Sequence, residues 1–206
     1  MDAVIWDFDG TLVDTYSKTV EVFRRVLREE NIQDNNSTKI LSLMRISVTH
    51  TINYYIDNYN LTEDAIERFN KYEKEINMSE INLYPNAKEI CKWIYDNGKK
   101  NFLYTHKDKL AIEYLKHYNI LNYFTECITR ENGFPPKPSP NSILYLIDKY
   151  NLKPNNIIMI GDRDIDILAA KSANIKGVFF KWNMNESNLE FADYNITNFN
   201  ELKYII

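Results

Sequence analysis

The chain has 206 residues, of which 44% are hydrophobic and 26% are charged, and its formal net charge is −4. This length accommodates one substantial core, or a core with a smaller accessory domain, and the balance of residue types is that of an ordinary globular protein. A slightly acidic chain gives no basis for a basic nucleic-acid-binding surface, so we expect no nucleic-acid partner.

The N-terminal segment has neither a basic start nor a long apolar stretch before it reaches Asp7. This pattern differs from that of a signal peptide, and no window comes near the roughly 18 apolar residues that a membrane-spanning helix needs. Cys91 and Cys127 fit no metal-binding or redox spacing, which favours buried, reduced thiols. We therefore expect a cytoplasmic protein without a membrane segment.

The chain begins with a short apolar run, residues 3–7, which ends in an acid and is typical of a buried parallel strand. After a loop over 8–14 the pattern becomes helical, with apolar residues spaced along one helix face: Tyr16, Val20, Phe23 and Leu27. More helices are predicted over about 38–45, about 48–59 and about 62–77, the last one capped by Thr62. We therefore predict an all-helical insert over residues 15–82.

From Leu83 onward, helices and strands alternate. Helices are predicted over 86–97, over a segment carrying Leu110, Tyr114, Leu115 and Tyr118, and over about 141–150 and about 165–173. Strands are predicted over 101–105, 126–129, 157–160 and 177–180, and residues 195–206 fit either a closing strand or a helix. Such alternation indicates a parallel sheet with helices on both faces. The predicted fold class is α/β, with a Rossmann-like core (residues 1–14 and 83–206) and an inserted helical cap (residues 15–82).

Three of the predicted strands end at a polar residue: Asp7, Thr105 and Asp162. In an open parallel sheet the ligand site lies beyond the carboxyl ends of the strands. We therefore expect these three residues to converge at that edge of the sheet.

Two acids stand close together after the first strand. Asp7 ends an apolar strand, where packing does not need a carboxylate, and Asp9 precedes Gly10, which permits a tight turn. Two such carboxylates repel each other unless a cation or a shared proton offsets the repulsion. Acids and glycine are also common in loops, which accounts for Asp9 and Gly10 but not for an acid at a buried strand end.

A second acidic group, Asp162, Asp164 and Asp166, follows the apolar strand 157–160. Mg²⁺ prefers oxygen ligands, few protein carboxylates and retained waters, and Asp7 and Asp162 with a main-chain carbonyl would supply that set. Asp164 fits the capping position of the next helix, and Asp166 fits a supporting role behind the metal rather than direct ligation.

A hydroxyl and a positive charge are added by Thr105, at a strand end, and by Lys137, in the proline-rich loop 134–140. The flanking prolines restrict that backbone and would hold the lysine in a fixed position. Taken alone, a threonine at a strand end is usually a cap and a loop lysine is usually solvated, so each signal is weak by itself.

Together these residues resemble the haloacid dehalogenase (HAD) superfamily, whose four signatures occur here in order between residues 7 and 166. The first covers Asp7, Asp9, Gly10 and Thr11, the second is Thr105, the third is Lys137 with Pro138, and the fourth covers Gly161, Asp162 and Asp166. The insert resembles a C1 cap, and the similarity is greatest to the phosphoglycolate phosphatase-like subgroup. The resemblance implies a Rossmann-like core, a required Mg²⁺ and hydrolysis of a phosphate ester through an aspartyl-phosphate.

The resemblance also implies roles for the acids. Asp7 would attack phosphorus and bind the metal, and Asp9 would protonate the leaving oxygen and then activate water. The main-chain carbonyl of Asp9 and the carboxylate of Asp162 would complete the Mg²⁺ site, with Asp166 behind it. A carboxylate nucleophile divides one difficult displacement into two easier ones, and the metal screens the repulsion between Asp7 and the phosphate.

The implied phosphate-binding groups are Thr105, the main-chain amide of His106, and Lys137, which would also orient Asp7. His106 and Lys107 depart from the family pattern, in which a small or amide residue often follows the threonine. A main-chain role at position 106 tolerates this departure. For the His106 side chain, a place at the mouth of a polar loop is at least as good an interpretation as a chemical role.

Asp9 separates this chain from dehalogenases and phosphonate-cleaving members, which lack the second acid of the first signature. The leading hypothesis is therefore a magnesium-dependent phosphatase acting on a small phosphorylated metabolite under a mobile cap. The alternatives are a sugar phosphomutase and a non-catalytic regulatory module on the same fold. Arg45 and His50 lie in the cap, where family members select substrates, although a solvated helix face suits either residue. The substrate and the oligomeric state stay open.

Overall fold

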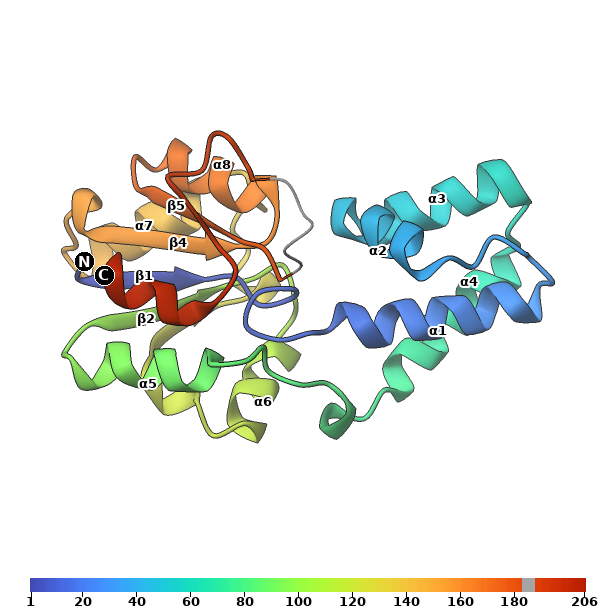
Figure 1. The fold of residues 1–206 in the computed structure, drawn as a ribbon, viewed down its shortest axis with the longest axis horizontal. Helices are drawn as coiled ribbons and strands as arrows, with labels where there is room; N and C mark the ends of the chain where they lie inside the picture. Colours follow the sequence, from blue (N-terminus) through green and yellow to red (C-terminus); the bar gives the residue numbers. More distant parts are fainter. Residues whose placement is uncertain (183–187) are drawn as a thin grey trace. The chain divides into compact units, whose positions relative to one another are not determined.

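The computed structural model describes residues 1–182 and 188–206, which form two compact units (Figure 1). One unit, which we call the α/β unit, comprises Met1–Val13 and Leu83–Ile206, and the other, the helical unit, comprises Asp14–Asn82. Within the described residues, every helix is too short or too polar to cross the apolar core of a membrane.

The α/β unit is built on a six-stranded parallel sheet with the order β3-β2-β1-β4-β5-β6. The strands are β1 (Ala3–Trp6), β2 (Lys100–Tyr104), β3 (Phe124–Ile128), β4 (Ile157–Gly161), β5 (Lys176–Phe180) and β6 (Tyr194–Ile196). The strand order reverses between β1 and β4, which is where open α/β sheets bind ligands. The register pairs Trp6 with Ile160, so the residues that follow these two strands are neighbours. The predicted α/β fold class is confirmed.

Helical segments cover both faces of this sheet. The helices of the α/β unit are α5 (Ala87–Asp96), α6 (Leu110–His117), α7 (Asn141–Lys149) and α8 (Asp164–Ser172), with 3-10 turns at Leu121–Tyr123, Arg130–Asn132, Pro154–Asn156 and Phe199–Tyr204. Ala3 and Ile5 of β1 belong to a core shared with α7 and α8, whereas Trp6 packs on Phe199 with ring centroids 5.4 Å apart. Apolar packing on both faces explains why β1 is a continuous apolar run.

Strand β1, which directly precedes Asp7, is held rigidly in the core of the α/β unit. All residues of β1 are fully buried, and burial of each large apolar side chain contributes about 1.5–3 kcal/mol. The Trp6 indole N–H donates to Asn101 Oδ1 at 2.9 Å, and the Asn101 amide donates to the Cys91 carbonyl at 2.9 Å. Because these buried polar groups are satisfied, the end of β1 is held in place by packing and hydrogen bonds.

The helical unit contains α1 (Tyr16–Glu29), α2 (Ser37–Ile46), α3 (Val48–Tyr59), α4 (Glu63–Glu75) and a 3-10 turn at Met78–Glu80. Its core includes Phe23, whose ring lies edge-on to Tyr55 and Phe69 with centroid distances of 5.2 and 5.3 Å. The Thr62 side chain accepts the Ala65 N–H and caps α4. The helices predicted in this part of the chain, and Thr62 as a cap, are confirmed.

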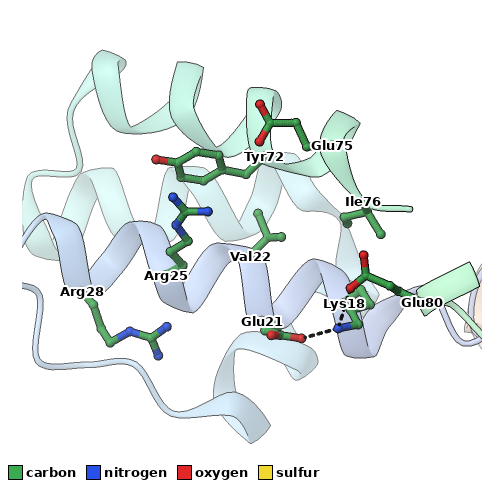
Figure 2. A pocket seen from close by; sticks show the side chains of 9 residues that line it. All are labelled: Lys18, Glu21, Val22, Arg25, Arg28, Tyr72, Glu75, Ile76 and Glu80. Atoms are coloured by element: carbon green, nitrogen blue, oxygen red, sulfur yellow. Dashed lines mark hydrogen bonds and ion pairs between the residues drawn. The ribbon is translucent and has the colours of Figure 1, made fainter. Parts of the chain in front are cut away.

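A pocket of about 310 Å³ lies on the helical unit between α1 and the end of α4 (Figure 2). Several of its charged side chains contact one another or a ring: Lys18 pairs with Glu21 and Glu80 at 2.9 and 3.2 Å, and the Arg25 guanidinium lies over the Tyr72 ring. None of the described residues that line it is a residue predicted to carry chemistry. The predicted chemistry therefore has to be found in the α/β unit.

Candidate active site

The site is built from the ends of two neighbouring strands, β1 and β4. Asp7 follows β1 and donates its backbone N–H to the Ile160 carbonyl of β4 at 2.9 Å, while Asp162 directly follows β4. Each of these two acids is only 2% exposed. Strand pairing therefore brings two buried carboxylates together at the reversal in strand order.

Asp166, in the first turn of α8, completes a cluster of three buried acids. One carboxylate oxygen from each of Asp7, Asp162 and Asp166 lies within 4.8 Å of the others. The Lys137 ammonium donates to Asp7 Oδ1 at 2.5 Å and to Asp166 Oδ1 at 2.6 Å, and its burial keeps solvent from screening these ion pairs. The positive charges of Lys137 and of Arg163, which also acts on Asp7, oppose three carboxylates, so the cluster still favours a further cation.

One carboxylate oxygen of Asp7 is buried and open to another ligand. Its Oδ2 atom accepts no hydrogen bond from the described residues, although it has almost no access to solvent. Asp166 differs, because its Oδ1 accepts Lys137 and its Oδ2 accepts the Arg163 backbone N–H at 3.1 Å. Carboxylate oxygens are the ligands that hard divalent cations prefer. Asp7 and Asp162 therefore fit a metal-binding role, and Asp166 fits the role of holding Lys137.

Burial sets the protonation of this cluster. It raises the pKa of Asp7 to about 6 against the opposing charge of Lys137, and the Asp166 carboxylate adds to the rise. Burial alone would lower the pKa of Lys137, but the carboxylates of Asp166 and Asp7 outweigh it and raise that pKa. Lys137 therefore stays protonated near pH 7. A metal ion at Asp7 would favour the ionised form of this carboxylate, which is the nucleophilic form.

Asp9 lies in a tight loop and keeps contact with solvent. Gly10 adopts a φ of 80°, in the left-handed region that glycine favours, and so permits the turn. The Asp9 side chain is 32% exposed, and its Oδ1 accepts Lys107 Nζ at 3.3 Å. Thr11, from the same loop, donates its hydroxyl to Asp162 at 3.3 Å. A partly exposed acid in the loop that follows Asp7 suits proton exchange better than the buried Asp7 does.

Three polar residues in a row follow β2: Thr105, His106 and Lys107. Thr105 is buried, and its hydroxyl accepts the Lys107 N–H at 3.0 Å. His106 Nε2 accepts the backbone N–H of Lys137 at 2.7 Å. Burial lowers the pKa of His106 to about 4, and the charges of Lys137 and Arg163 contribute to the shift. The imidazole is therefore neutral near pH 7, as an accepting nitrogen must be.

Gly161, the last residue of β4, allows Asp166 to approach the strand. A β-carbon at Gly161 would lie 2.3 Å from the Asp166 Cβ and Cγ atoms and 2.4 Å from its Oδ2. Real atoms do not approach so closely, so any side chain at this position would displace the acid. This glycine is needed for the space that it leaves and not for its backbone conformation.

A family model described as haloacid dehalogenase-like hydrolase matches residues 4–180. The matched span contains every residue of the acid cluster, the segment after β2 and Lys137. The chain belongs to this family. The predicted superfamily is therefore confirmed, as is the predicted class of enzyme, a HAD-type phosphoric monoester hydrolase.

Curated relatives agree with the predicted phosphoglycolate phosphatase-like subgroup. The chain is 28% identical over 196 residues to a phosphoglycolate phosphatase of Vibrio vulnificus, which covers 89% of this chain and 86% of that protein. It is 29% identical over 195 residues to a phosphoglycolate phosphatase of Colwellia psychrerythraea, again covering 89% and 86%. It also resembles a candidate pyrophosphatase, PpaX, of Caldanaerobacter subterraneus, with 24% identity over 208 residues and coverage of 99% and 94%.

Solved structures share the fold of this HAD-family chain. A predicted phosphoglycolate phosphatase from Haemophilus somnus superposes with a TM-score of 0.83 at 23% identity, covering 100% of this chain and 97% of that one. A candidate beta-phosphoglucomutase from Thermotoga maritima superposes with a TM-score of 0.82 at 22% identity, with both chains covered completely. At these sequence identities, the structural similarity is evidence for the shared fold alone.

The HAD-family site brings the predicted residues together to different degrees. Lys137 joins Asp7 to Asp166 directly, and Asp162 lies within the same cluster. Asp9 is linked to the segment after β2 through Lys107. Thr105 and His106 belong to that segment, at the end of the strand that pairs with β1. The chemical roles assigned to all seven predicted residues remain proposals.

Sequence reasoning missed three contacts of this site: Thr11 to Asp162, Lys107 to Asp9, and the His106 side chain to Lys137. Thr11 belongs to the first signature, so its position was a usable signal. The other two contacts join segments that are far apart in sequence, and no local pattern marks them. The predicted capping position of Asp164 is wrong, because the N-cap of α8 is Arg163, Asp164 is the first helical residue, and Asp166 accepts the Arg163 N–H at 3.1 Å.

Proposed function

We propose that this chain is a magnesium-dependent phosphatase that hydrolyses a small phosphate monoester through a covalent phosphoryl intermediate on Asp7. The observation that carries the proposal is the environment of Asp7. One carboxylate oxygen accepts Lys137, and the other is buried, in a cluster with Asp162, without a hydrogen bond from the described residues. Such a carboxylate is oriented from one side and available to a cation from the other.

In the first step, a carboxylate oxygen of Asp7 attacks phosphorus, a new P–O bond forms and the ester P–O bond breaks. Asp9 donates its proton to the departing oxygen, which leaves as an alcohol. The partial exposure of Asp9 supports this role, because it can exchange protons with solvent. A positioned acid of this kind typically contributes about 10²–10⁴-fold to the rate.

In the second step, Asp9 is ionised and takes a proton from a water molecule, whose oxygen attacks phosphorus. The bond between phosphorus and the Asp7 oxygen breaks, so the free carboxylate returns and inorganic phosphate is released. The advantage of a carboxylate nucleophile is that two easier displacements replace one difficult one.

Mg²⁺ would be held by the carboxylates of Asp7 and Asp162 and by the main-chain carbonyl of Asp9. When bound, the ion supplies positive charge that screens the repulsion between Asp7 and the phosphate. Asp166 supports the arrangement by holding Lys137, which in turn orients Asp7. The buried Asp7 oxygen and the excess of carboxylates over lysine in this cluster support a bound cation.

The phosphate oxygens would be bound by the Thr105 hydroxyl, the main-chain N–H of His106 and the Lys137 ammonium. Phosphoryl transfer demands little covalent work from a protein beyond positioning and charge stabilisation. A hydroxyl, an amide and an ammonium supply both. Thr105 and His106 follow β2, the strand that pairs with β1, which supports their place beside Asp7.

We infer a small phosphorylated metabolite as the substrate, with phosphoglycolate the first to test, because the curated relatives from Vibrio and Colwellia are phosphoglycolate phosphatases. In this proposal the α/β unit is the catalytic core of a cytoplasmic enzyme, and residues 15–82 form a cap that selects the substrate. Arg45, half-buried in the last turn of α2, and His50, exposed in the first turn of α3, are the residues to vary for specificity.

Replacement of the nucleophile tests the proposal. Asp7→Asn keeps the shape of the side chain but removes its nucleophilic charge, so Mg²⁺-dependent phosphate release from a panel of phosphate esters is expected to fall by at least about 10³-fold. Asp148→Asn, on the exposed side of α7, is a matched control that is expected to keep wild-type turnover. Unchanged turnover in Asp7→Asn would rule out the nucleophile assignment.

The same panel separates the two alternatives. Transfer of the phosphoryl group to a second sugar hydroxyl, with a long-lived phosphorylated Asp7, would identify a phosphomutase. A phosphomutase is supported here only by the shared fold of the Thermotoga protein. Absence of turnover of every ester in the presence of Mg²⁺ would favour a non-catalytic module, against which the retained acids Asp7, Asp9 and Asp162 argue.

A further inference from the structure

The side chain of His106 reaches the loop that carries Lys137. Its Nε2 atom accepts the Lys137 backbone N–H at 2.7 Å, although the two residues are 31 positions apart in the sequence. His106 is fixed at its own end because the preceding Thr105 donates its N–H to the Ile128 carbonyl of β3 at 3.0 Å. The imidazole thus connects the edge of the sheet to the main chain of the lysine loop.

This loop offers few other backbone donors. Prolines occupy positions 135, 136, 138 and 140, and proline has no N–H. Between residues 135 and 140 the remaining N–H, from Ser139, donates to the Pro136 carbonyl within the loop itself. Within residues 135–140 the Lys137 N–H is therefore the backbone donor that bonds outward, and its acceptor is the His106 imidazole; the loop also accepts the Tyr104 hydroxyl of β2 at the Pro135 carbonyl, at 3.3 Å.

The placement of the Lys137 main chain decides where its ammonium lies. The side chain has four rotatable bonds, and its Nζ atom has to stay within hydrogen-bond reach of both Asp7 and Asp166, at 2.5 and 2.6 Å. The residue is buried, so a shift of its backbone has no solvent-filled space in which the side chain can adjust. A hydrogen bond that fixes the Lys137 backbone therefore also fixes the position of the ammonium beside Asp7.

The acceptor function of His106 requires an unprotonated Nε2, and the surroundings favour that state. Burial and the charges of Lys137 and Arg163 lower the pKa of His106 to about 4. Near pH 7 the imidazole is neutral, so the proton it retains belongs on Nδ1 when Nε2 accepts the amide.

We propose that His106 is a positioning residue, whose Nε2 atom fixes the Lys137 main chain and so holds the lysine ammonium against Asp7. This role is separate from that of the His106 main-chain N–H, and it explains why a histidine can follow Thr105 in this chain. The inference rests on the proposed function, because it takes the orientation of Asp7 by Lys137 to matter for catalysis.

Two substitutions at His106 distinguish its role as a hydrogen-bond acceptor from the effect of its size. Glutamine places an amide oxygen at about the reach of Nε2 and keeps the acceptor, so His106→Gln is expected to retain kcat within about threefold. Leucine fills the space without accepting, so His106→Leu is expected to lose about 10–100-fold in kcat with a smaller change in KM. His117→Leu, at an exposed position at the end of α6, is the matched control and is expected to behave as wild type.

A spectroscopic measurement tests the contact without relying on activity. In uniformly ¹⁵N-labelled protein at pH 7, the His106 imidazole is expected to show Nδ1 protonated and Nε2 unprotonated. The resonance of the Lys137 amide proton is expected to shift in His106→Leu. A folded His106→Leu with wild-type kcat, or a protonated Nε2 in the wild type, would overturn the inference. If the wild type hydrolyses no ester, the proposed function fails, and the imidazole spectrum alone then decides whether the contact exists.

Discussion

At the scale of single residues, the site depends on the space that Gly161 leaves beside Asp166. A methyl group at Gly161 would lie 2.3 Å from two carbon atoms of that acid, which is buried and holds Lys137. Gly161→Ala is therefore expected to displace Asp166, to lower the free energy of unfolding by about 1–3 kcal/mol through overpacking, and to lower kcat about 10²-fold. Urea unfolding and steady-state kinetics on the same protein measure both effects.

A second glycine provides the control for this substitution. Gly98 has a φ of 71°, and a β-carbon at this position would meet no heavy atom within 4 Å, so Gly98→Ala strains the backbone without touching the site. It is expected to cost about 1 kcal/mol of stability and to leave kcat unchanged. Equal losses of kcat in Gly161→Ala and Gly98→Ala would show that the first effect is only a loss of stability.

Some residues of the site could be predicted from sequence and others could not, for a physical reason. Asp7 and Asp162 directly follow apolar strands, and strand ends converge in a parallel sheet, so local patterns are sufficient to place them together. The importance of Gly161 as free space and of His106 as an acceptor depends on which atoms face each other after folding. Sequence spacing carries no information on such contacts.

At the scale of elements, the bond between the end of β2 and the lysine loop predicts how stability depends on pH. His106 has an ordinary pKa of 6.5 in the unfolded chain and a pKa of about 4 in the fold. Lys137 and Arg163 act against its protonation, whereas Asp166 and Asp9 favour it. Between these two values the unfolded state binds more protons, so the free energy of unfolding falls as the pH falls through this window.

His106→Gln removes this titration and is expected to lose less stability than the wild type on acidification. Urea unfolding at pH 7 and pH 5 is expected to show a difference of about 1 kcal/mol between the two proteins, a value reduced for the partial exposure of the imidazole. His117→Gln, at an exposed position, is expected to keep the wild-type difference. An identical pH dependence in His106→Gln and wild type would contradict the assignment of a buried, neutral imidazole.

The elements themselves were largely predictable, because each is marked by a local pattern. The apolar run over 157–160 became β4, and the helical spacing from Tyr16 became α1. The closing segment fitted either a strand or a helix, and it contains both: the short strand β6 (Tyr194–Ile196) and the 3-10 turn Phe199–Tyr204. A strand of three residues is too short for a period-2 pattern to reveal it.

At the scale of the whole molecule, the two units differ in what a metal ion can stabilise. Asp7, Asp162, Asp166 and Lys137 all belong to the α/β unit, where three buried carboxylates face one ammonium. A bound cation relieves the remaining repulsion only in the folded state, because the unfolded chain does not assemble these acids. Binding of Mg²⁺ is therefore linked to the stability of this unit and not to that of the helical unit.

Mg²⁺ at about 100 times its Kd is expected to add about 2.7 kcal/mol to the free energy of unfolding, which raises the melting temperature by about 5–10 °C for a chain of this size. Thermal melts with Mg²⁺ and with EDTA measure the shift. Asp162→Asn removes one ligand and one repelling charge, so it is expected to lose the shift while staying as stable as the metal-free wild type. Asp148→Asn, outside the cluster, is expected to keep the shift. A wild type that melts identically with Mg²⁺ and EDTA would show that the acid cluster binds no such ion.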